Sequence, residues 1–128
     1  MRLLACGSRD FEDKHGVLYA VIDGMCWKAE LEGWLYLVEG EAPGADTLAK
    51  RAAETSPTGA TIVPFPADWE QYGRRAGPIR NQQMLDEGKP ELVIAFINKP
   101  LEESRGTYDM VKRAWAADLP VVVVHQWA

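Results

Sequence analysis

The chain has 128 residues, of which 47% are hydrophobic and 26% charged, and its formal net charge is −5. This length is that of one domain with its own core, so we expect residues 1–128 to form a single domain. The acidic balance argues against a protein that wraps nucleic acid, because such proteins present a basic surface. No apolar run is long enough to cross a bilayer, and the N-terminal residues turn polar too early for a secretory signal. The sequence therefore predicts a cytoplasmic protein with no membrane partner.

The cysteines and histidines offer no metal site. Cys6 and Cys26 lie within apolar segments, where buried free thiols are expected. His15 and His125 are isolated from each other and from both cysteines. This spacing matches no known set of metal ligands. We therefore expect neither a metal nor a bound cofactor.

Short apolar runs alternate with helical patterns through the first half of the chain. The apolar run Leu3–Cys6 is followed by glycine, as is typical of a buried strand. Apolar residues then recur at three- and four-residue spacing from Asp13 until Gly33, which predicts a helix. The next predicted elements are a strand at Trp34–Val38, a helix at Thr47–Thr55 and a strand at Ala60–Pro64.

The second half continues the alternation after a long connection. We expect Pro66–Ala76 to be irregular, and long ordered connections in α/β domains are often functional. Gly77-Pro78 then opens a helix, because proline at the first helical position loses no hydrogen bond. That helix runs to about Glu87, and it is followed by a strand at Leu92–Ile97, a helix at Thr107–Ala117 and a strand at Val121–Val124.

These alternating strands and helices predict an α/β fold. Nearly every predicted strand is apolar along both faces, which is typical of a parallel sheet covered on both sides. Because crossovers between parallel strands are right-handed, we predict a Rossmann-like three-layer sandwich with a five-stranded parallel sheet in the order 3-2-1-4-5. Open α/β sheets bind their ligands at the carboxyl edge, beside the switch point that this order places between the first and fourth strands.

Three turns rich in small residues follow strands and are expected to meet at this edge. A glycine lets the backbone approach a ligand closely, and the unpaired N–H groups of a following helix attract anions. Arg9 can bind two oxygens of an anion at once, and Arg105 adds a positive charge. In the alternative interpretation, Ser8 and Asp46 only cap the helices that follow them. The turns are Gly7-Ser8-Arg9, Gly40–Asp46 and Ser104–Thr107.

Side chains beyond these turns extend the predicted site. Trp69 and Tyr72 are either stacking platforms for a base or buried aromatics. Arg80 and Asn81 lie about one helical turn past Gly77, and asparagine disfavours a helix interior, so a polar contact is expected there. The predicted ligand-binding residues are Gly7, Ser8, Arg9, Gly40, Gly44, Ala45, Asp46, Asp68, Trp69, Arg80, Asn81, Ser104, Arg105, Gly106 and Thr107.

Five motifs with these residues occur in order along most of the chain: Gly7-Ser8-Arg9, Gly40–Asp46, Pro66–Trp69, Ala76–Asn81 and Ser104-x-Gly106-Thr107. Together they resemble the YspA / cpYpsA-related branch of the SLOG superfamily, which is common in bacteria and their phages. The resemblance implies a Rossmann-like domain that binds a nucleotide or nucleotide-derived ligand at the carboxyl edge of its sheet. It also implies more distant links to the Lonely Guy phosphoribohydrolases and to the DNA-processing protein A family.

Two positions depart from these relatives. The branch usually has a second glycine where this chain has Glu41, whose carboxylate either points to solvent or contacts a ribose hydroxyl. The phosphoribohydrolases carry a glutamate three residues beyond the threonine of the last motif. Here Met110 occupies that position and Asp109 lies one residue before it.

The sequence leaves three functions open. The first is a sensor or sequestering protein for a nucleotide-like small molecule such as ADP-ribose or an NAD derivative. The second is a hydrolase of a nucleotide N-glycosidic bond, which needs a carboxylate, and Asp68, Asp109, Glu41 and Asp46 are all candidates. The third is binding of single-stranded DNA. Nucleic acid has the least support as a partner, because no basic stripe with interleaved aromatics is present.

The tryptophans leave the oligomeric state open as well. Trp27, Trp34, Trp115 and Trp127 are spread along the chain and fit either a core or an interface between copies. A homo-oligomer is therefore compatible with the sequence.

Overall fold

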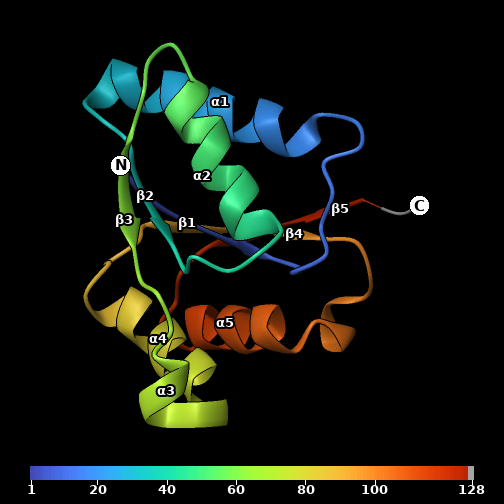
Figure 1. Ribbon diagram of the computed structural model, residues 1–128. Helices are drawn as coiled ribbons and strands as arrows, with labels where there is room; N and C mark the ends of the chain where they lie inside the picture. Colours follow the sequence, from blue (N-terminus) through green and yellow to red (C-terminus); the bar gives the residue numbers. More distant parts are fainter. Residues whose placement is uncertain (127–128) are drawn as a thin grey trace.

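A five-stranded parallel sheet forms the middle layer of the computed structural model, which describes residues 1–126 (Figure 1). The strand order is β3-β2-β1-β4-β5, which confirms the predicted order. Trp127 lies outside the described residues. The strands are β1 (Arg2–Gly7), β2 (Tyr36–Glu39), β3 (Thr61–Pro64), β4 (Leu92–Ile97) and β5 (Val121–His125).

Helices cover both faces of this sheet, as the predicted three-layer sandwich requires. Figure 1 shows α1 and α2 on one face, and α3, α4 and α5 on the other. Two short 3-10 turns, Gly73–Arg75 and Leu101–Glu103, precede α4 and α5. The helices are α1 (Val17–Glu32), α2 (Ala45–Thr55), α3 (Trp69–Tyr72), α4 (Ala76–Asp86) and α5 (Arg105–Ala116).

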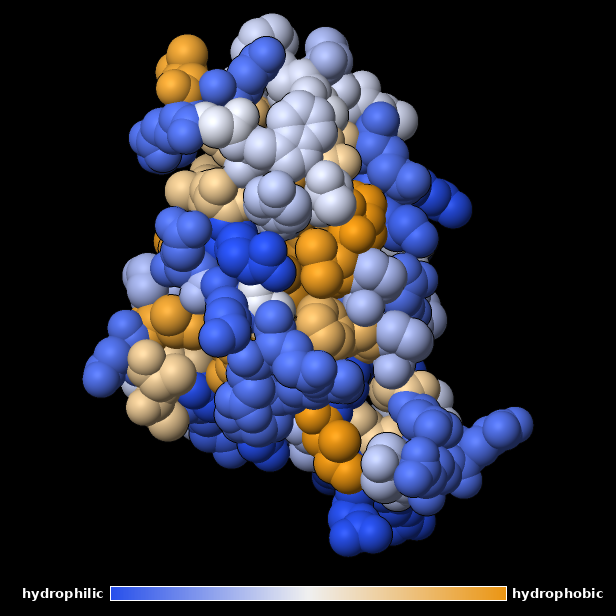
Figure 2. Space-filling model, turned by 90° about the vertical axis from the view of Figure 1, so that its left-hand side faces the viewer, coloured by the Kyte–Doolittle hydropathy of each residue, from blue (hydrophilic) through white to orange (hydrophobic). Residues whose placement is uncertain are grey.

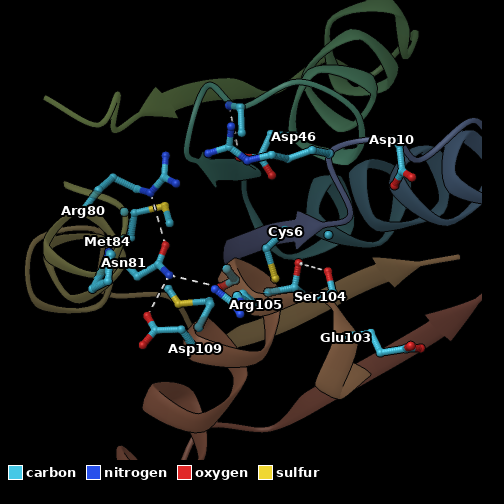
Figure 3. A pocket seen from close by; sticks show the side chains of 18 of the residues that line it. Cys6, Asp10, Asp46, Arg80, Asn81, Met84, Glu103, Ser104, Arg105 and Asp109 are labelled. Carbon is cyan, nitrogen blue, oxygen red and sulfur yellow. Dashed lines mark hydrogen bonds between the residues drawn. The ribbon is translucent and has the colours of Figure 1, made fainter. Parts of the chain in front are cut away.

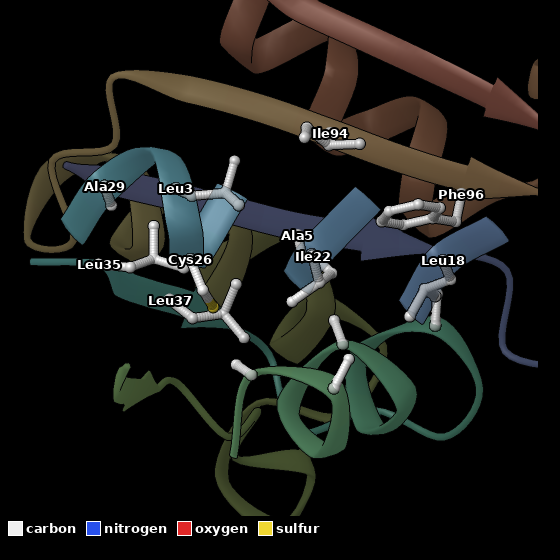
Figure 4. Close-up of a cluster of buried hydrophobic side chains, with 14 of the residues drawn as sticks. Leu3, Ala5, Leu18, Ile22, Cys26, Ala29, Leu35, Leu37, Ile94 and Phe96 are labelled. Carbon is white, nitrogen blue, oxygen red and sulfur yellow. The ribbon is translucent and has the colours of Figure 1, made fainter. Parts of the chain in front are cut away.

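Alternate residues of the central strands fill two cores. Successive side chains of a strand point to opposite faces, so an unbroken apolar run is buried on both sides. Leu3 and Ala5 of β1 pack under α1 and α2 with Phe96 of β4 (Figure 4). Leu4 and Cys6 belong to the second core, together with buried side chains of α4 and α5. The apolar pattern of β1 and β4 therefore reflects burial on both faces.

The edge strands are less covered than the pattern predicts. In β5, Val122 is 48% exposed, and in β3 both Ile62 and Val63 are only partly buried. Figure 2 faces the β3 edge and shows apolar patches across the middle of that side, between hydrophilic side chains. Pro64 ends β3 and has no N–H group to donate, which limits strand pairing at this edge.

Most predicted boundaries differ from the structure by at most two residues, but two predictions are wrong by more, and an aspartate is involved in each. Helix α1 begins at Val17 rather than at Asp13, because the Asp13 carboxylate accepts hydrogen bonds from the N–H groups of Leu18 (2.9 Å) and Tyr19 (3.0 Å). The segment predicted to be irregular contains α3, whose first turn is closed by the Asp68 carboxylate accepting from the N–H of Gln71 (3.1 Å). Side-chain caps thus set both helix starts.

Within residues 1–126, no helix has the length and apolar character that a membrane span requires. The same residues contain no group of three side chains arranged to hold a metal ion. Cys6 and Cys26 are free and buried.

Candidate functional site

A cavity of about 670 Å³ opens at the carboxyl end of β1, where the first turns of α4 and α5 meet the loop before α2 (Figure 3). It lies beside the junction of β1 and β4, which is the switch point of the sheet. The structure brings most of the predicted ligand-binding residues together in its wall. Those that line it are Gly7, Arg9, Asp46, Trp69, Arg80, Asn81, Ser104, Arg105, Gly106 and Thr107.

The other predicted residues do not line the cavity and have contacts elsewhere. The carbonyl of Ser8 accepts from the N–H of Ala45 (3.2 Å), which fastens the loop after β1 to the start of α2. Ser8 caps no helix, because α1 begins only at Val17. The prediction that a helix directly follows the turn Gly7-Ser8-Arg9 is therefore wrong. Asp68 caps α3, and Gly40 and Gly44 belong to the connection between β2 and α2 without lining the cavity.

Three glycines of the motifs serve packing inside the protein. A Cβ at Gly7 would overlap the carbonyl oxygen of Phe96 and lie 2.6 Å from the Cβ of Ala45. Gly44 has a φ of +77°, and a Cβ there would overlap the backbone after β1. At Gly40, the space of a Cβ is filled by the guanidinium of Arg80. These glycines keep strands, loops and Arg80 close together around the site.

Gly106 differs, because no atom lies within 4 Å of the position that its Cβ would take. It is exposed and lines the cavity at the first turn of α5. Of these four glycines, only Gly106 therefore fits the predicted role of opening the backbone to a ligand.

Arg80 and Asp46 join the loop after β2 to α4. The Arg80 guanidinium donates to the carbonyl of Gly40, and Asp46 Oδ2 accepts from the N–H groups of Gly40 (3.1 Å) and Ala42 (3.3 Å). Asp46 therefore closes the loop before α2 instead of capping the N–H groups of that helix. Both side chains are at most 9% exposed and border the cavity from this side (Figure 3).

Burial and charge compete at this pair. Burial raises the pKa of Asp46 to about 6, although the hydrogen bonds from Ala42 and Gly40 and the charge of Arg80 lower it. Burial also lowers the pKa of Arg80. Cys6 lies on the cavity floor, and burial followed by the Asp46 charge raises its pKa far above the ordinary value, so its thiol stays protonated.

Glu39, which the sequence analysis did not predict as a site residue, is fully buried at the end of β2. Its Oε1 accepts from the N–H of Glu41 (3.1 Å), and its Oε2 has no partner among the described residues. Burial, and then the charges of Glu41 and Asp46, raise the pKa of Glu39 to about 8. An acidic residue at the end of an otherwise apolar parallel strand is the sequence signal that marks it.

The first turn of α5 forms another wall. Ser104 and Thr107 are buried there, and Ser104 Oγ donates to Thr107 Oγ1 (3.2 Å). Asn81 Nδ2 donates to the carbonyl of Gly106 (3.2 Å) and to Asp109 Oδ2 (2.9 Å). The polar contact expected of Asn81 is thus with α5, and it fixes the two helix starts relative to each other (Figure 3).

Of the four candidate carboxylates for catalysis, only Asp46 and Asp109 line the cavity. Burial raises the pKa of Asp109, but hydrogen bonds from Arg113 (2.9 Å) and Asn81 outweigh it, and the pKa is lowered. Asp109 is therefore an ionised carboxylate held between α4 and α5. Glu41 lies outside the wall, beside Lys50.

Cations gather around the mouth of the cavity. Arg9, Arg74 and Arg105 are exposed and line the cavity. Lys99 lines it as well and is half-buried. The Arg9 guanidinium lies 5.4 Å from the ring centre of Trp69, which is 48% exposed. The starts of α2, α4 and α5 add the positive ends of three helix dipoles. Lining residues absent from the predicted site include Cys6, Asp10, Lys99, Glu103 and Met110.

Lys99 could have been predicted from the sequence, because it comes two residues after β4 at the same sheet edge. Asp10 and Glu103 could not have been predicted as site residues, because only the fold brings the loop after β1 and the turn before α5 to one end of the cavity (Figure 3).

Glu41 has a φ of +58°, in the left-handed region that favours glycine. This conformation explains why the relatives that the sequence resembles have glycine here. The Glu41 side chain pairs with Lys50 (3.3 Å) and does not line the cavity.

We expect Glu41→Gly to raise the free energy of unfolding by about 0.5–1 kcal/mol, because the relieved strain exceeds the loss of an exposed ion pair. Glu41→Ala is the matched control: it removes the same charge but keeps the unfavourable φ, so its stability is expected to fall slightly. Urea denaturation of both variants measures the difference, and equal stabilities would contradict the assignment of strain to Glu41.

Comparison with known proteins agrees with the motifs. The model of the YspA, cpYpsA-related SLOG family matches residues 1–72, which span β1 to α3. The chain is also similar to the Gene 61 protein of Mycobacterium phage D29, with 35% identity over 124 residues that cover 94% of each chain. No solved structure matches the chain. The family match suggests nucleotide-ligand binding in general.

Proposed function

The chain belongs to the YspA, cpYpsA-related SLOG family, and from that premise we propose that its cavity binds a nucleotide-derived small molecule such as ADP-ribose or an NAD derivative. In this proposal the protein is a sensor or a sequestering protein and not a hydrolase. A cavity of about 670 Å³ is in the range of small-molecule sites.

The observation that carries the proposal is the convergence of an anion-binding wall and an aromatic wall on one cavity. The first turn of α5 supplies two hydroxyl groups, the open backbone at Gly106 and the charge of Arg105. Trp69 and Arg9 supply a flat, cationic surface. Phosphates bind to the first kind of surface and bases stack on the second.

Hydrolysis has weaker support. Asp109 is occupied by Arg113 and Asn81, Met110 is buried at the place of the relatives' glutamate, and Asp68 and Glu41 lie outside the wall. Asp46 is the remaining candidate carboxylate in the cavity, and its oxygen Oδ2 already closes the loop before α2.

Thermal-shift titration with ADP-ribose, NAD and AMP tests the proposal. We expect at least one of them to raise the unfolding temperature of the wild type. Arg105→Ala is expected to reduce that shift, because the removed side chain lines the cavity. Arg75→Ala is the matched control, since Arg75 is also exposed but does not line it. The absence of any shift, or equal losses in both variants, would contradict the proposal, and release of free base would favour the hydrolase.

Binding of ADP-ribose is expected to tighten about 5-fold as the pH falls from 7 to 5, because Asp46, with a pKa of about 6, then loses its negative charge beside the bound anion. The pyrophosphate of ADP-ribose does not titrate in this range, so the change reports the protein. Asp46→Asn keeps an oxygen that can accept from Gly40 and Ala42, and it is expected to abolish the pH dependence. Calorimetric titration at both pH values measures it, and an unchanged dependence in the variant would refute the role of Asp46.

A further inference from the structure

Helix α1 carries an apolar stripe on the side that faces away from the sheet. Its inner side is buried through Leu18, Ile22, Cys26 and Ala29. A helix on the surface of a protein is normally polar on its outer side. Here the outer side has Val17 at 40%, Trp27 at 51% and Leu31 at 89% exposure, with exposed Ala20 and Gly24 between them.

These five residues follow the spacing of a helix-pairing seam. Positions 17, 20, 24, 27 and 31 alternate steps of three and four, which is the spacing of the seam along which two helices pack in coiled coils. We propose that this stripe is an interface between two copies of the chain, with their α1 helices antiparallel about a two-fold axis at Gly24.

The stripe is complementary to itself in this arrangement. Val17 and Leu31 are each seven residues from Gly24, so the axis sets Val17 of one copy against Leu31 of the other. Trp27 lies three residues after Gly24, and it therefore meets the small side chains at Ala20 and Gly24 of the second copy. Trp27 thus faces small residues and Val17 faces Leu31 as an apolar pair, an arrangement in which two helices can pack closely.

Gly24 supports the close approach of a second helix. A glycine inside a helix costs roughly 0.5–1 kcal/mol relative to alanine. No atom of the described chain lies within 4 Å of the position that a Cβ of Gly24 would take, so nothing inside one copy requires glycine there. A helix that packs against this position does require it.

Few charged side chains flank the stripe. Lys28 lies 3.2 Å from Glu32 on the same helix, so these two charges are paired within each copy. Asp23 accepts from the hydroxyl of Ser56 (2.7 Å) but keeps its negative charge, and the axis at Gly24 brings the two copies of Asp23 to the same side of the seam. Their repulsion is one reason to expect a weak dimer.

The area of the stripe sets the strength of the interface. The exposed parts of Val17, Trp27 and Leu31 amount to about 300–400 Å² per copy, which is less than the ~800 Å² per partner of a standard interface. We therefore expect a weak dimer whose dissociation constant lies on the order of 10–100 μM.

Sedimentation velocity over a concentration series tests the interface. The wild type is expected to change from monomer to dimer as its concentration rises through that range. Trp27→Lys is expected to stay monomeric. Trp115→Lys is the matched control, because Trp115 is 52% exposed on α5, at the opposite face of the sheet (Figure 1), and it is expected to dimerise like the wild type. A wild type that stays monomeric, or equal behaviour of both variants, would overturn the proposal.

Cysteine cross-linking tests the antiparallel arrangement. With a thiol oxidant such as diamide, the double variant Val17→Cys/Leu31→Cys is expected to form a disulfide-linked dimer, because the axis sets position 17 of one copy against position 31 of the other. Val17→Cys alone and Leu31→Cys alone are the matched controls and are expected not to cross-link. Cys6 and Cys26 are buried, and the wild type gives the background from these native thiols. Cross-linking of either single variant would indicate parallel helices, and no cross-linking of the double variant would remove the interface; either result overturns the arrangement.

Discussion

Replacing Gly7 with alanine is expected to lower the free energy of unfolding by about 3 kcal/mol or more, enough to unfold much of the protein. The added Cβ would overlap the carbonyl oxygen of Phe96 in β4 and come within 2.6 Å of the Cβ of Ala45 in α2. Both neighbours belong to the packed centre of the molecule and neither is the end of a flexible side chain. β1 and β4 would have to separate at the edge where the cavity lies.

Gly106→Ala is the matched control for Gly7→Ala. Its Cβ would meet no atom within 4 Å, so we expect nearly wild-type stability. Because Gly106 lines the cavity, the added methyl is expected to weaken ligand binding instead. Chemical denaturation separates the two glycines. Equal stability of Gly7→Ala and the wild type would show that Gly7 is not a packing residue.

Replacing Glu39 with glutamine is expected to remove the largest pH dependence of the protein's stability between pH 5 and 8. The pKa of Glu39 is about 8 in the folded state and 4.5 as its ordinary value. Between these values the folded state keeps a proton that the unfolded state releases. The contribution of Glu39 to stability is therefore full below pH 4.5 and decreases as the pH rises towards 8, by about 1.4 kcal/mol per pH unit at most. Between pH 5 and 8 the loss is on the order of 3 kcal/mol.

Glutamine does not titrate, so the slope from Glu39 vanishes in the variant. The measurement is the free energy of unfolding at pH 5, 6.5 and 8 for the wild type, Glu39→Gln and Glu54→Gln, the last being an exposed glutamate. The slope decides the outcome, because a buried amide can change the absolute stability at every pH. A variant that keeps the slope of the wild type would show that Glu39 is ionised in the folded protein.

The sequence predicted the sheet because its signal is local. Each central strand is a short apolar run that ends in a turn, and right-handed crossovers then leave few possible strand orders. The cavity could be predicted for the same reason, since the turns after β1, β2 and β4 must emerge at one edge. Arg9, Arg105 and Thr107 follow from that placement alone.

The remaining features depend on contacts that no local pattern carries. Asp13 and Asp68 start helices through hydrogen bonds that helical periodicity does not reveal. A glycine that permits close packing, such as Gly7, has the same one-letter signature as one that opens to a ligand, such as Gly106. Trp27 was compatible with a core or an interface, and only its exposure of 51% in the structure separates the two.

A nitrogen–proton correlation spectrum recorded during titration with ADP-ribose, NAD or AMP tests the binding proposal most directly. The predicted result is saturable shifts of the amide signals of Gly106 and Thr107 and of the Trp69 indole, with little change at Gly59 and Gly33, which lie outside the cavity wall. The proposal is contradicted if none of these molecules shifts any signal, or if the shifts cluster away from the first turn of α5 and Trp69.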